Sequence, residues 1–323
     1  MAICEIRARL CTLLAEICPG HINAFMFPSS GTEANEAAIR IARKYTGRKK
    51  IMSRYRSYHG GTLASLAMTG DCRRFDVDKD ITGFIKIFDP YPMYFKWSEE
   101  RNEDEIAERA LNALHEQILL ENPNDIAAIF IEGITGTNGW LKPPDKYVQG
   151  IRALCDEYGI VMVCDEVMAG FGRTGKMFSF EHYEGVQPDI MTFAKGLTGS
   201  YMPLSGVGVS DRIMDYFRDK PVGYGSTFQA HPLSMATAYA VVKYLIDNNI
   251  LQHVQEMEGV MKTEMQQLLD TMPDTVAQAR VYGMAGCIDV MNPETMDIIC
   301  STNEVHPKMT QLKQNLNKNG LVT

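Results

Sequence analysis

The sequence of 323 residues lacks a long apolar run and lacks an excess of basic residues. No apolar stretch approaches the roughly 18 residues that a membrane helix needs, which excludes a membrane-spanning protein. The formal net charge is -8, and the densest charge run, at 98–110, is acidic and predicts a solvated helix face. Nucleic acid selects clusters of Lys and Arg, so it is excluded as a partner, and a small molecule is expected.

Paired cysteine motifs are also missing, because the eight cysteines contain no C-x-x-C pair and no metal-ligand spacing with histidine. We therefore expect reduced thiols and no metal. Cys4, Cys11 and Cys18 recur every seven residues, which predicts small buried residues on one side of a helix. The opening MAICEIRARLCTLLAEI predicts an amphipathic helix, not a signal peptide, and a cytoplasmic protein. Organellar targeting stays open if the chain is a fragment.

Linkers, repeats and low-complexity tracts are absent, and short apolar runs alternate with helical patterns. That alternation predicts an α/β fold with a mostly parallel central sheet flanked by helices. Strands are expected at 23–27, 49–55, 127–132, 160–165, 189–194 and 204–210, and helices at 33–46, 103–120 and 145–158.

The pattern changes near residue 232 to two long helices and then to one strand-like stretch, RVYGMAGCIDV, at 280–290. We place a domain boundary near 245, with a large domain at 1–245 and a partial, smaller α+β domain at 246–323. The second domain is interpreted as incomplete, because its pattern stops at NKNGLVT without a closing element.

The stretch VCDEVMAGFGRTGKM (163–177) satisfies two nucleotide-binding patterns from Gly170 onward, G-x-G-x-x-G and G-x-x-x-x-G-K. A P-loop needs Ser or Thr after its Lys, and Met177 stands there. A dinucleotide loop starts directly at the strand end, whereas DEVMA intervenes here. Both patterns are rejected, and a nucleotide-binding module is kept only as a distant alternative.

Two ionisable residues stand at the ends of neighbouring expected strands. Asp165 ends the strand at 160–165, and Lys195 follows the strand at 189–194. Open α/β sheets place ligand-binding groups at the carboxyl ends of their strands. A buried, desolvated Lys has a depressed pKa suited to forming a Schiff base. A salt bridge between the two, or a structural role for Asp165, is the alternative.

A third piece is the helix start at Ser30, Gly31 and Thr32, where free backbone N–H groups form a site for phosphate. A capping box of Ser30 with Glu33 is the structural alternative, and both can hold together. A carboxylate for a ring nitrogen, a Lys for an aldehyde and a phosphate site together describe pyridoxal phosphate.

The motifs SSGTEANEAA, SYHGGT, CDEVMAGFGRTG and TFAKGL resemble those of the class III aminotransferases, pyridoxal phosphate enzymes of fold type I, over nearly the whole chain. The resemblance implies that Lys195 forms the Schiff base and moves the proton, and that Asp165 keeps the pyridine nitrogen protonated. It also implies that Glu132 is the family's active-site glutamate and that GFGRTG is a glycine-rich loop beside the site.

The resemblance further implies that Ser30, Gly31 and Thr32 hold the phosphate, and it adds four contacts. Tyr58 stacks on the cofactor ring and Val167 packs on its opposite face, unless both are core residues. His59 either tunes the site or is a structural histidine. Thr227 in GSTFQAHP resembles a residue that reaches the phosphate of the neighbouring subunit, which implies a homodimer; a turn residue is the alternative.

The chain departs from the family pattern in three places. It starts late and ends before the family's arginine for a substrate carboxylate, and GITGTNG replaces the usual sequence after Glu132. The expected activity is transfer of an amino group from an ω-amino compound (β-alanine, 4-aminobutyrate, taurine or a diamine) to a keto acid such as pyruvate. An aminomutase or decarboxylase of the same fold, and a non-catalytic remnant, are the alternatives.

Overall fold

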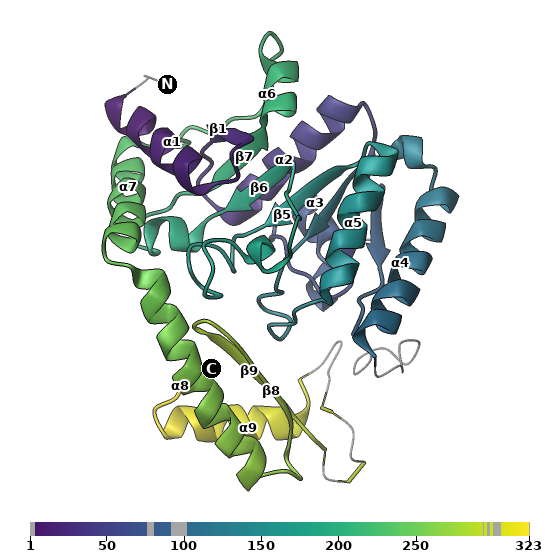
Figure 1. Cartoon of the computed structure of the whole chain (residues 1–323), viewed down its shortest axis with the longest axis vertical. Coiled ribbons are helices and arrows are strands. Elements are labelled where there is room, and N and C mark those ends of the chain that lie inside the picture. The colour runs from purple at the N-terminus through teal and green to yellow at the C-terminus, as the bar shows by residue number, and fades with distance from the viewer. Residues whose placement is uncertain are drawn as a thin grey trace.

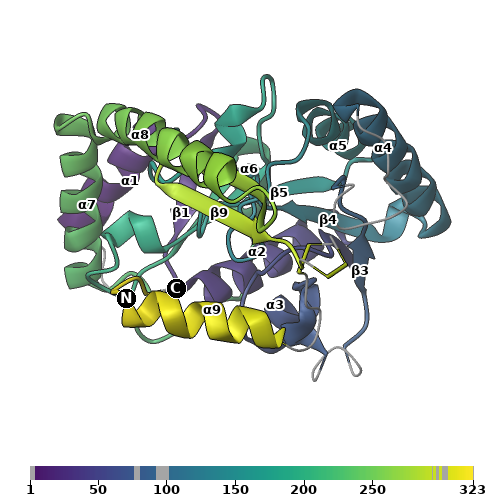
Figure 2. The ribbon, with the colours of Figure 1, turned by 90° about the horizontal axis from the view of Figure 1, so that it is seen from below.

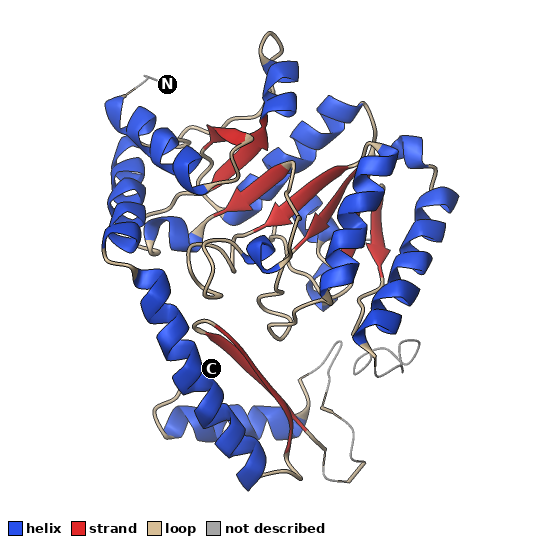
Figure 3. Cartoon of the chain, viewed as in Figure 1, coloured by secondary structure: helices blue, strands red, loops and turns tan. Residues whose placement is uncertain are grey.

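The computed structural model describes residues 4–75, 81–91, 102–292, 294–295, 298–299 and 305–322. It contains a seven-stranded sheet with helices and, below it in Figures 1 and 3, a two-stranded sheet with two further helices. The larger sheet consists of β1 (Ile22–Met26), β2 (Lys50–Arg54), β3 (Phe84–Ile87), β4 (Ile126–Ile131), β5 (Val161–Asp165), β6 (Ile190–Phe193) and β7 (Gly206–Ser210). Its helices are α1 (Glu5–Ile17), α2 (Gly31–Thr46), α3 (Leu63–Met68), α4 (Glu103–Leu120), α5 (Asp145–Tyr158), α6 (Asp211–Phe217) and α7 (Pro232–Asp247).

The strand order is β1-β7-β6-β5-β4-β2-β3, and the five strands from β6 to β3 are mutually parallel. Only the β1 end differs, because β7 is antiparallel both to β6 and to β1. The predicted α/β fold with a mostly parallel sheet is therefore confirmed. The six expected strands are present within one or two residues, and β3 is an additional one.

Helices cover both faces of the sheet, and a separate core lies on each side. One core joins the sheet to α1, α4, α5 and α7, and the other joins it to α2, α3 and α6. Along β4, Ile129 and Ile131 belong to the first core, whereas Ala128 and Phe130 belong to the second. Alternate side chains of a strand point to opposite faces, so a strand covered on both sides has to be apolar throughout, as β4 is.

The acidic run is exposed from Glu103 onward except for residues such as Ile106, as a solvated helix face requires. Residues 98–101 lie outside the described residues.

Of the three evenly spaced cysteines, only Cys18 is buried. The expectation that all three are buried in one helix is wrong, because α1 begins after Cys4 and ends before Cys18.

The two long helices predicted after residue 232 are α7 and α8 (Ile250–Thr271). The stretch at 280–290 is a hairpin and not the single strand expected, because Gly283 (φ +56°) turns the chain between β8 (Val276–Tyr282) and β9 (Ala285–Val290). Helix α8 packs on this hairpin (Figure 2). Helix α9 (Pro307–Lys318) was not predicted, and the domain boundary near 245 stays a prediction.

Candidate active site

A cavity of about 230 Å³ lies where β5 and β6 end and α2 begins. It brings together eight of the ten residues expected from the sequence; Ser30 and Thr227 do not line it. The lining residues are Gly31, Thr32, Asn35, Tyr58, His59, Gly60, Gly61, Glu132, Thr137, Asp165, Val167, Met168, Ala194 and Lys195.

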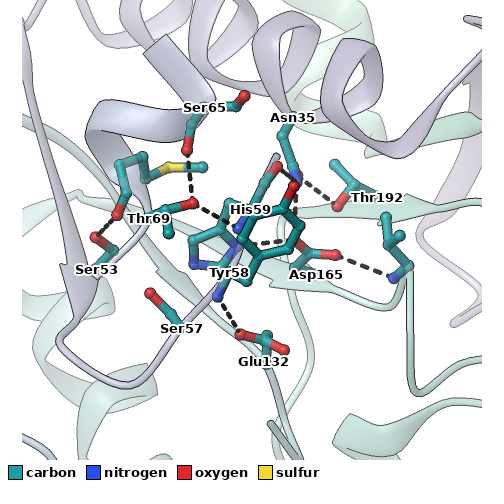
Figure 4. A network of polar contacts seen from close by, with 12 residues as sticks. Asn35, Ser53, Ser57, Tyr58, His59, Ser65, Thr69, Glu132, Asp165 and Thr192 are labelled. Atoms are coloured by element: carbon teal, nitrogen blue, oxygen red, sulfur yellow. Dashed lines mark hydrogen bonds and ion pairs between the residues drawn. The ribbon is translucent and has the colours of Figure 1, made fainter. Parts of the chain in front are cut away.

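Asp165 is the last residue of β5 and is held by three donors (Figure 4). Its Oδ2 accepts from Asn35 Nδ2 at 2.8 Å and lies 2.8 Å from His59 Nδ1, and its Oδ1 accepts from the Val167 amide at 3.0 Å. A carboxylate only accepts, so the short contact places the histidine proton on Nδ1. Asp165 is 3% exposed. The carboxyl group is therefore buried and oriented by three hydrogen-bond donors.

Asn35 on α2 was missed by the sequence reasoning. Its amide also donates to the His59 carbonyl at 2.7 Å, and its oxygen accepts from Thr192 Oγ1 on β6 at 2.8 Å. A polar residue on the apolar stripe of a buried helix was the available signal, since such a residue needs partners. His59 Nε2 is buried without a hydrogen-bond partner among the described residues.

Lys195 follows β6 and begins a short 3-10 helix, η6 (Lys195–Thr198), with φ +27°. A non-glycine residue in this region is strained, and such strain concentrates at functional sites. The side chain is exposed, and among the described residues no ion pair joins it to Asp165. The expected burial of Lys195 is therefore wrong. The reason is that Lys195 also lines a second, open cavity of about 660 Å³ on its other side.

The start of α2 has the form expected of a phosphate site, with Ser30 as its N-cap. Ser30 Oγ accepts from the Glu33 amide at 3.4 Å, but the Glu33 carboxylate accepts from the amide of Ser29 instead of Ser30. The predicted capping box is thus displaced by one residue. Thr32 Oγ1 lies 2.7 Å from Ser65 Oγ, which brings hydroxyls of two segments together beside free helix N–H groups.

Glu132 follows β4 and is almost fully buried, and burial raises its pKa. Its Oε1 accepts from the Tyr58 amide at 3.0 Å, and its Oε2 accepts from the Gly136 amide at 2.9 Å. Beneath it lies Arg54, a buried cation that donates to the Glu132 carbonyl at 2.5 Å and lies 3.6 Å from Asp89. This ion pair was not foreseen, because both residues follow ordinary strand patterns.

The GFGRTG segment is a loop between β5 and the next short helix, and it opens no helix at Gly175. Gly172 (φ +88°) and Gly175 (φ +82°) have left-handed backbones that favour glycine. The rejection of both nucleotide-loop patterns agrees with this path. Thr227 is exposed and stands outside the cavity of its own chain.

The donor set fits pyridoxal phosphate. It offers an oriented buried carboxylate for a ring nitrogen, a primary amine for the aldehyde and a helix start for the phosphate, around one cavity. Among the described residues no group of three His, Cys, Asp or Glu side chains could hold a metal ion. In the same part of the chain, no helix has the length and apolar character to cross a membrane.

The fold and the site together define a pyridoxal phosphate enzyme of fold type I. Residues 4–323 match the family model described as aminotransferase class-III, and the chain belongs to that family. It is a pyridoxal phosphate-dependent aminotransferase, with a sheet and helices like those of solved class III transaminases.

Three similar structures illustrate the relationship. A taurine:2-oxoglutarate aminotransferase from Bifidobacterium kashiwanohense, in complex with PLP and glutamate, is 38% identical, with a TM-score of 0.94 over 100% of this chain and 73% of that chain. An (S)-enantioselective ω-transaminase from Thermomicrobium roseum is 32% identical, with a TM-score of 0.90 over 99% of this chain and 72% of that chain. An ω-transaminase from Pseudomonas jessenii in complex with PMP is 26% identical, with a TM-score of 0.92 over 100% of this chain and 72% of that chain.

Proposed function

We propose that this aminotransferase moves an amino group from an ω-amino compound, such as β-alanine, 4-aminobutyrate, taurine or a diamine, to a keto acid such as pyruvate. The observation that carries the proposal is the placement of Asp165 and Lys195 at the carboxyl ends of adjacent parallel strands, around one cavity. The donor class is supported by the relatives, which include a taurine aminotransferase and ω-transaminases.

In this proposal the two ionisable residues divide the proton chemistry. Pyridoxal phosphate supplies, when bound, an aldehyde that takes up amines and a ring that accepts electrons. Asp165 keeps a proton on the ring nitrogen, and Asn35 and His59 hold its carboxylate in place. Lys195 Nζ, which lines the cavity, would hold the aldehyde and would move a proton as a general base and acid.

The remaining residues position the cofactor. Ser30, Gly31 and Thr32 bind the phosphate at the N-terminus of α2, where the helix dipole favours an anion. Tyr58 and Val167 pack on the two faces of the ring. The Glu132 carboxylate fixes the Tyr58 backbone, because it accepts the hydrogen bond of that amide.

A homodimer completes the site in this proposal. Thr227 is exposed and outside its own cavity, and its neighbour Phe228 is 70% exposed. Large apolar side chains are also exposed at Leu63, Tyr201 and Leu233, close in sequence to cavity-lining or loop segments. Exposed apolar surface of this kind marks interaction sites. The surface supports a second copy whose Thr227 reaches the phosphate.

The test is the absorption spectrum of the purified protein with pyridoxal phosphate, recorded before and after addition of β-alanine. We expect a visible cofactor band that shifts when the amine is added and that is lost on borohydride reduction of Lys195. Lys195→Ala should lower turnover by at least about 10²-fold, because the proton-transfer group is lost. Lys176→Ala, at an exposed loop lysine, is the matched control and should leave the spectrum and the turnover unchanged.

Full turnover by Lys195→Ala would refute this mechanism. Product analysis with β-alanine and pyruvate separates transfer from the other reactions of the same cofactor. Transfer yields alanine from pyruvate in a one-to-one ratio with donor consumed, whereas a decarboxylase releases carbon dioxide and an aminomutase needs no keto acid. A wild-type protein that gives no band and no alanine would contradict the proposal.

A further inference from the structure

A cation that contacts two residues of the cavity wall has no role in the proton chemistry above. Arg73 lies in η1 (Cys72–Arg74), and its guanidinium carbon is 3.7 Å from the centroid of the Tyr58 ring. Its Nη2 donates to Thr137 Oγ1 at 3.0 Å. Tyr58 and Thr137 both line the cavity, and they come from segments far apart in the sequence. Arg73 therefore contacts two residues of the cavity wall.

Asp71 orients this guanidinium without using all of its donors. Arg73 Nε lies 3.0 Å from both oxygens of the Asp71 carboxylate, and Nη2 contacts the same carboxylate. The hydrogen bond to Asp71 raises the pKa of Arg73, so the group stays charged. In the described part of the chain, Nη1 has no hydrogen-bond partner, and the side chain is 46% exposed. An oriented guanidinium with a free edge suits a carboxylate or another oxyanion.

The charges inside the cavity explain why such a cation is useful. Asp165 and Glu132 contribute two carboxyl groups to the lining, and Lys195 is its only cationic residue among those described. Lys195 is committed to the cofactor aldehyde. Keto acids, ω-amino acids and taurine all carry an anionic group, which gains from a separate cation outside the carboxyl-rich cavity.

We propose that Arg73, together with the Thr137 hydroxyl, binds the carboxylate or sulfonate of the substrate and thereby selects acidic substrates. The inference rests on the proposed function, because it names the residue that recognises the acid group of the keto acid and of those donors, other than a diamine, that carry one. The Thr137 hydroxyl accepts a hydrogen bond from Arg73 and can donate one to the same anion. An amine without an acid group gains nothing from Arg73.

The experiment compares Arg73→Gln with wild type as holoenzymes. We expect KM for β-alanine and pyruvate to rise about 10- to 100-fold with little change in kcat, since a charge-assisted hydrogen bond is lost from substrate binding. The first half-reaction with butylamine, which has no acid group, should keep its wild-type rate. Arg74→Gln is the matched control, because the neighbouring Arg74 packs on Tyr55 and Phe75 instead.

Two outcomes would overturn the assignment. An unchanged KM for β-alanine and pyruvate in Arg73→Gln shows that Arg73 does not bind the acid group. An equal loss with butylamine and with β-alanine shows that Arg73 only positions Tyr58. If wild type transfers no amino group, the proposed function fails on its own. The role of Arg73 is then tested by titrating the holoenzyme with glutarate and following the absorbance. Equal glutarate affinity in Arg73→Gln and wild type would overturn the assignment of Arg73.

Discussion

Gly31 shows how strictly a single position can be constrained at this site. A Cβ atom built on Gly31 would lie 2.7 Å from Val167 Cγ1 and 3.1 Å from Cγ2. Distances of this size force the neighbouring side chain to move, and overpacking of this kind destabilises proteins by about 1–3 kcal/mol. Gly31, at the start of α2, and Val167, expected on the face of the cofactor ring, are therefore matched in size.

We predict that Gly31→Ala lowers both the stability and the affinity for pyridoxal phosphate, because Val167 is pushed from its place. Urea unfolding and a cofactor titration followed by absorbance measure the two effects. Gly20→Ala is the control, since a Cβ there meets nothing within 4 Å. Equal behaviour of the two variants would show that Val167 yields freely.

The residue scale also shows which parts of the site a sequence can reveal. Asp165 and Lys195 were found because a charge at the end of an apolar strand stands out in the sequence. Asn35 and Arg54 were missed, since their importance depends on partners more than 75 positions away, such as the Glu132 carbonyl. The exposure of Lys195 was also not predictable, because it depends on how loops open a second cavity.

At the scale of elements, Glu166 joins the end of β5 to the short 3-10 helix (Ser179–His182) that follows the glycine-rich loop. Its carboxylate accepts from the Ser179 amide at 2.8 Å, the Ser179 hydroxyl at 2.7 Å and the Phe180 amide at 3.1 Å. Burial raises the pKa of Glu166 to about 7, although these hydrogen bonds lower it. The folded state thus holds a proton on this group more readily than the unfolded chain does.

We therefore predict that Glu166 makes the protein less stable as pH rises from about 4.5 to about 7. In that range the unfolded chain loses the proton first, and deprotonation favours unfolding. Glu166→Gln cannot titrate, so its free energy of unfolding should depend less on pH in this window. Urea unfolding at a series of pH values checks this, with the exposed Glu184→Gln as control. Parallel curves for wild type and Glu166→Gln would refute the assignment.

The helices and strands differ in how well the sequence predicts them. β4 is buried at all six positions, and its apolar run predicted it directly. The stretch at 280–290 reads as one strand, since its apolar pattern continues through the two-residue turn at Gly283 and Met284. α9 has no buried residue, so no apolar stripe could predict it.

At the scale of the whole molecule, the proposed homodimer predicts complementation between subunits. If Thr227 serves the partner's cofactor, then both sites are disabled in a homodimer of Lys195→Ala and in a homodimer of Thr227→Ala. A mixed dimer of the two variants has one site with both changes and one site with neither. Random mixing after unfolding and refolding should restore about a quarter of the wild-type sites. Two inactive parents that regain activity on mixing would support the shared site.

The complementation test has a built-in control. Lys195→Ala mixed with a Lys195→Ala, Thr227→Ala double variant contains no intact site and should stay inactive. Activity that fails to return in the first mixture, although size-exclusion chromatography shows dimers, would mean that Thr227 serves its own chain or neither. The domain boundary near residue 245 also stays a prediction.

The strand order also has a consequence for how the chain acquires its cofactor. β1, which leads into Gly31, pairs with β7 and not with the next strand in the sequence. The N-terminal segment therefore has no place in the sheet until residues 206–210 are available. Such long-range pairing is slow to form. During synthesis we expect the phosphate end of the site to stay unassembled until residues 206–210 have left the ribosome, so that capture of the cofactor reports a completed sheet.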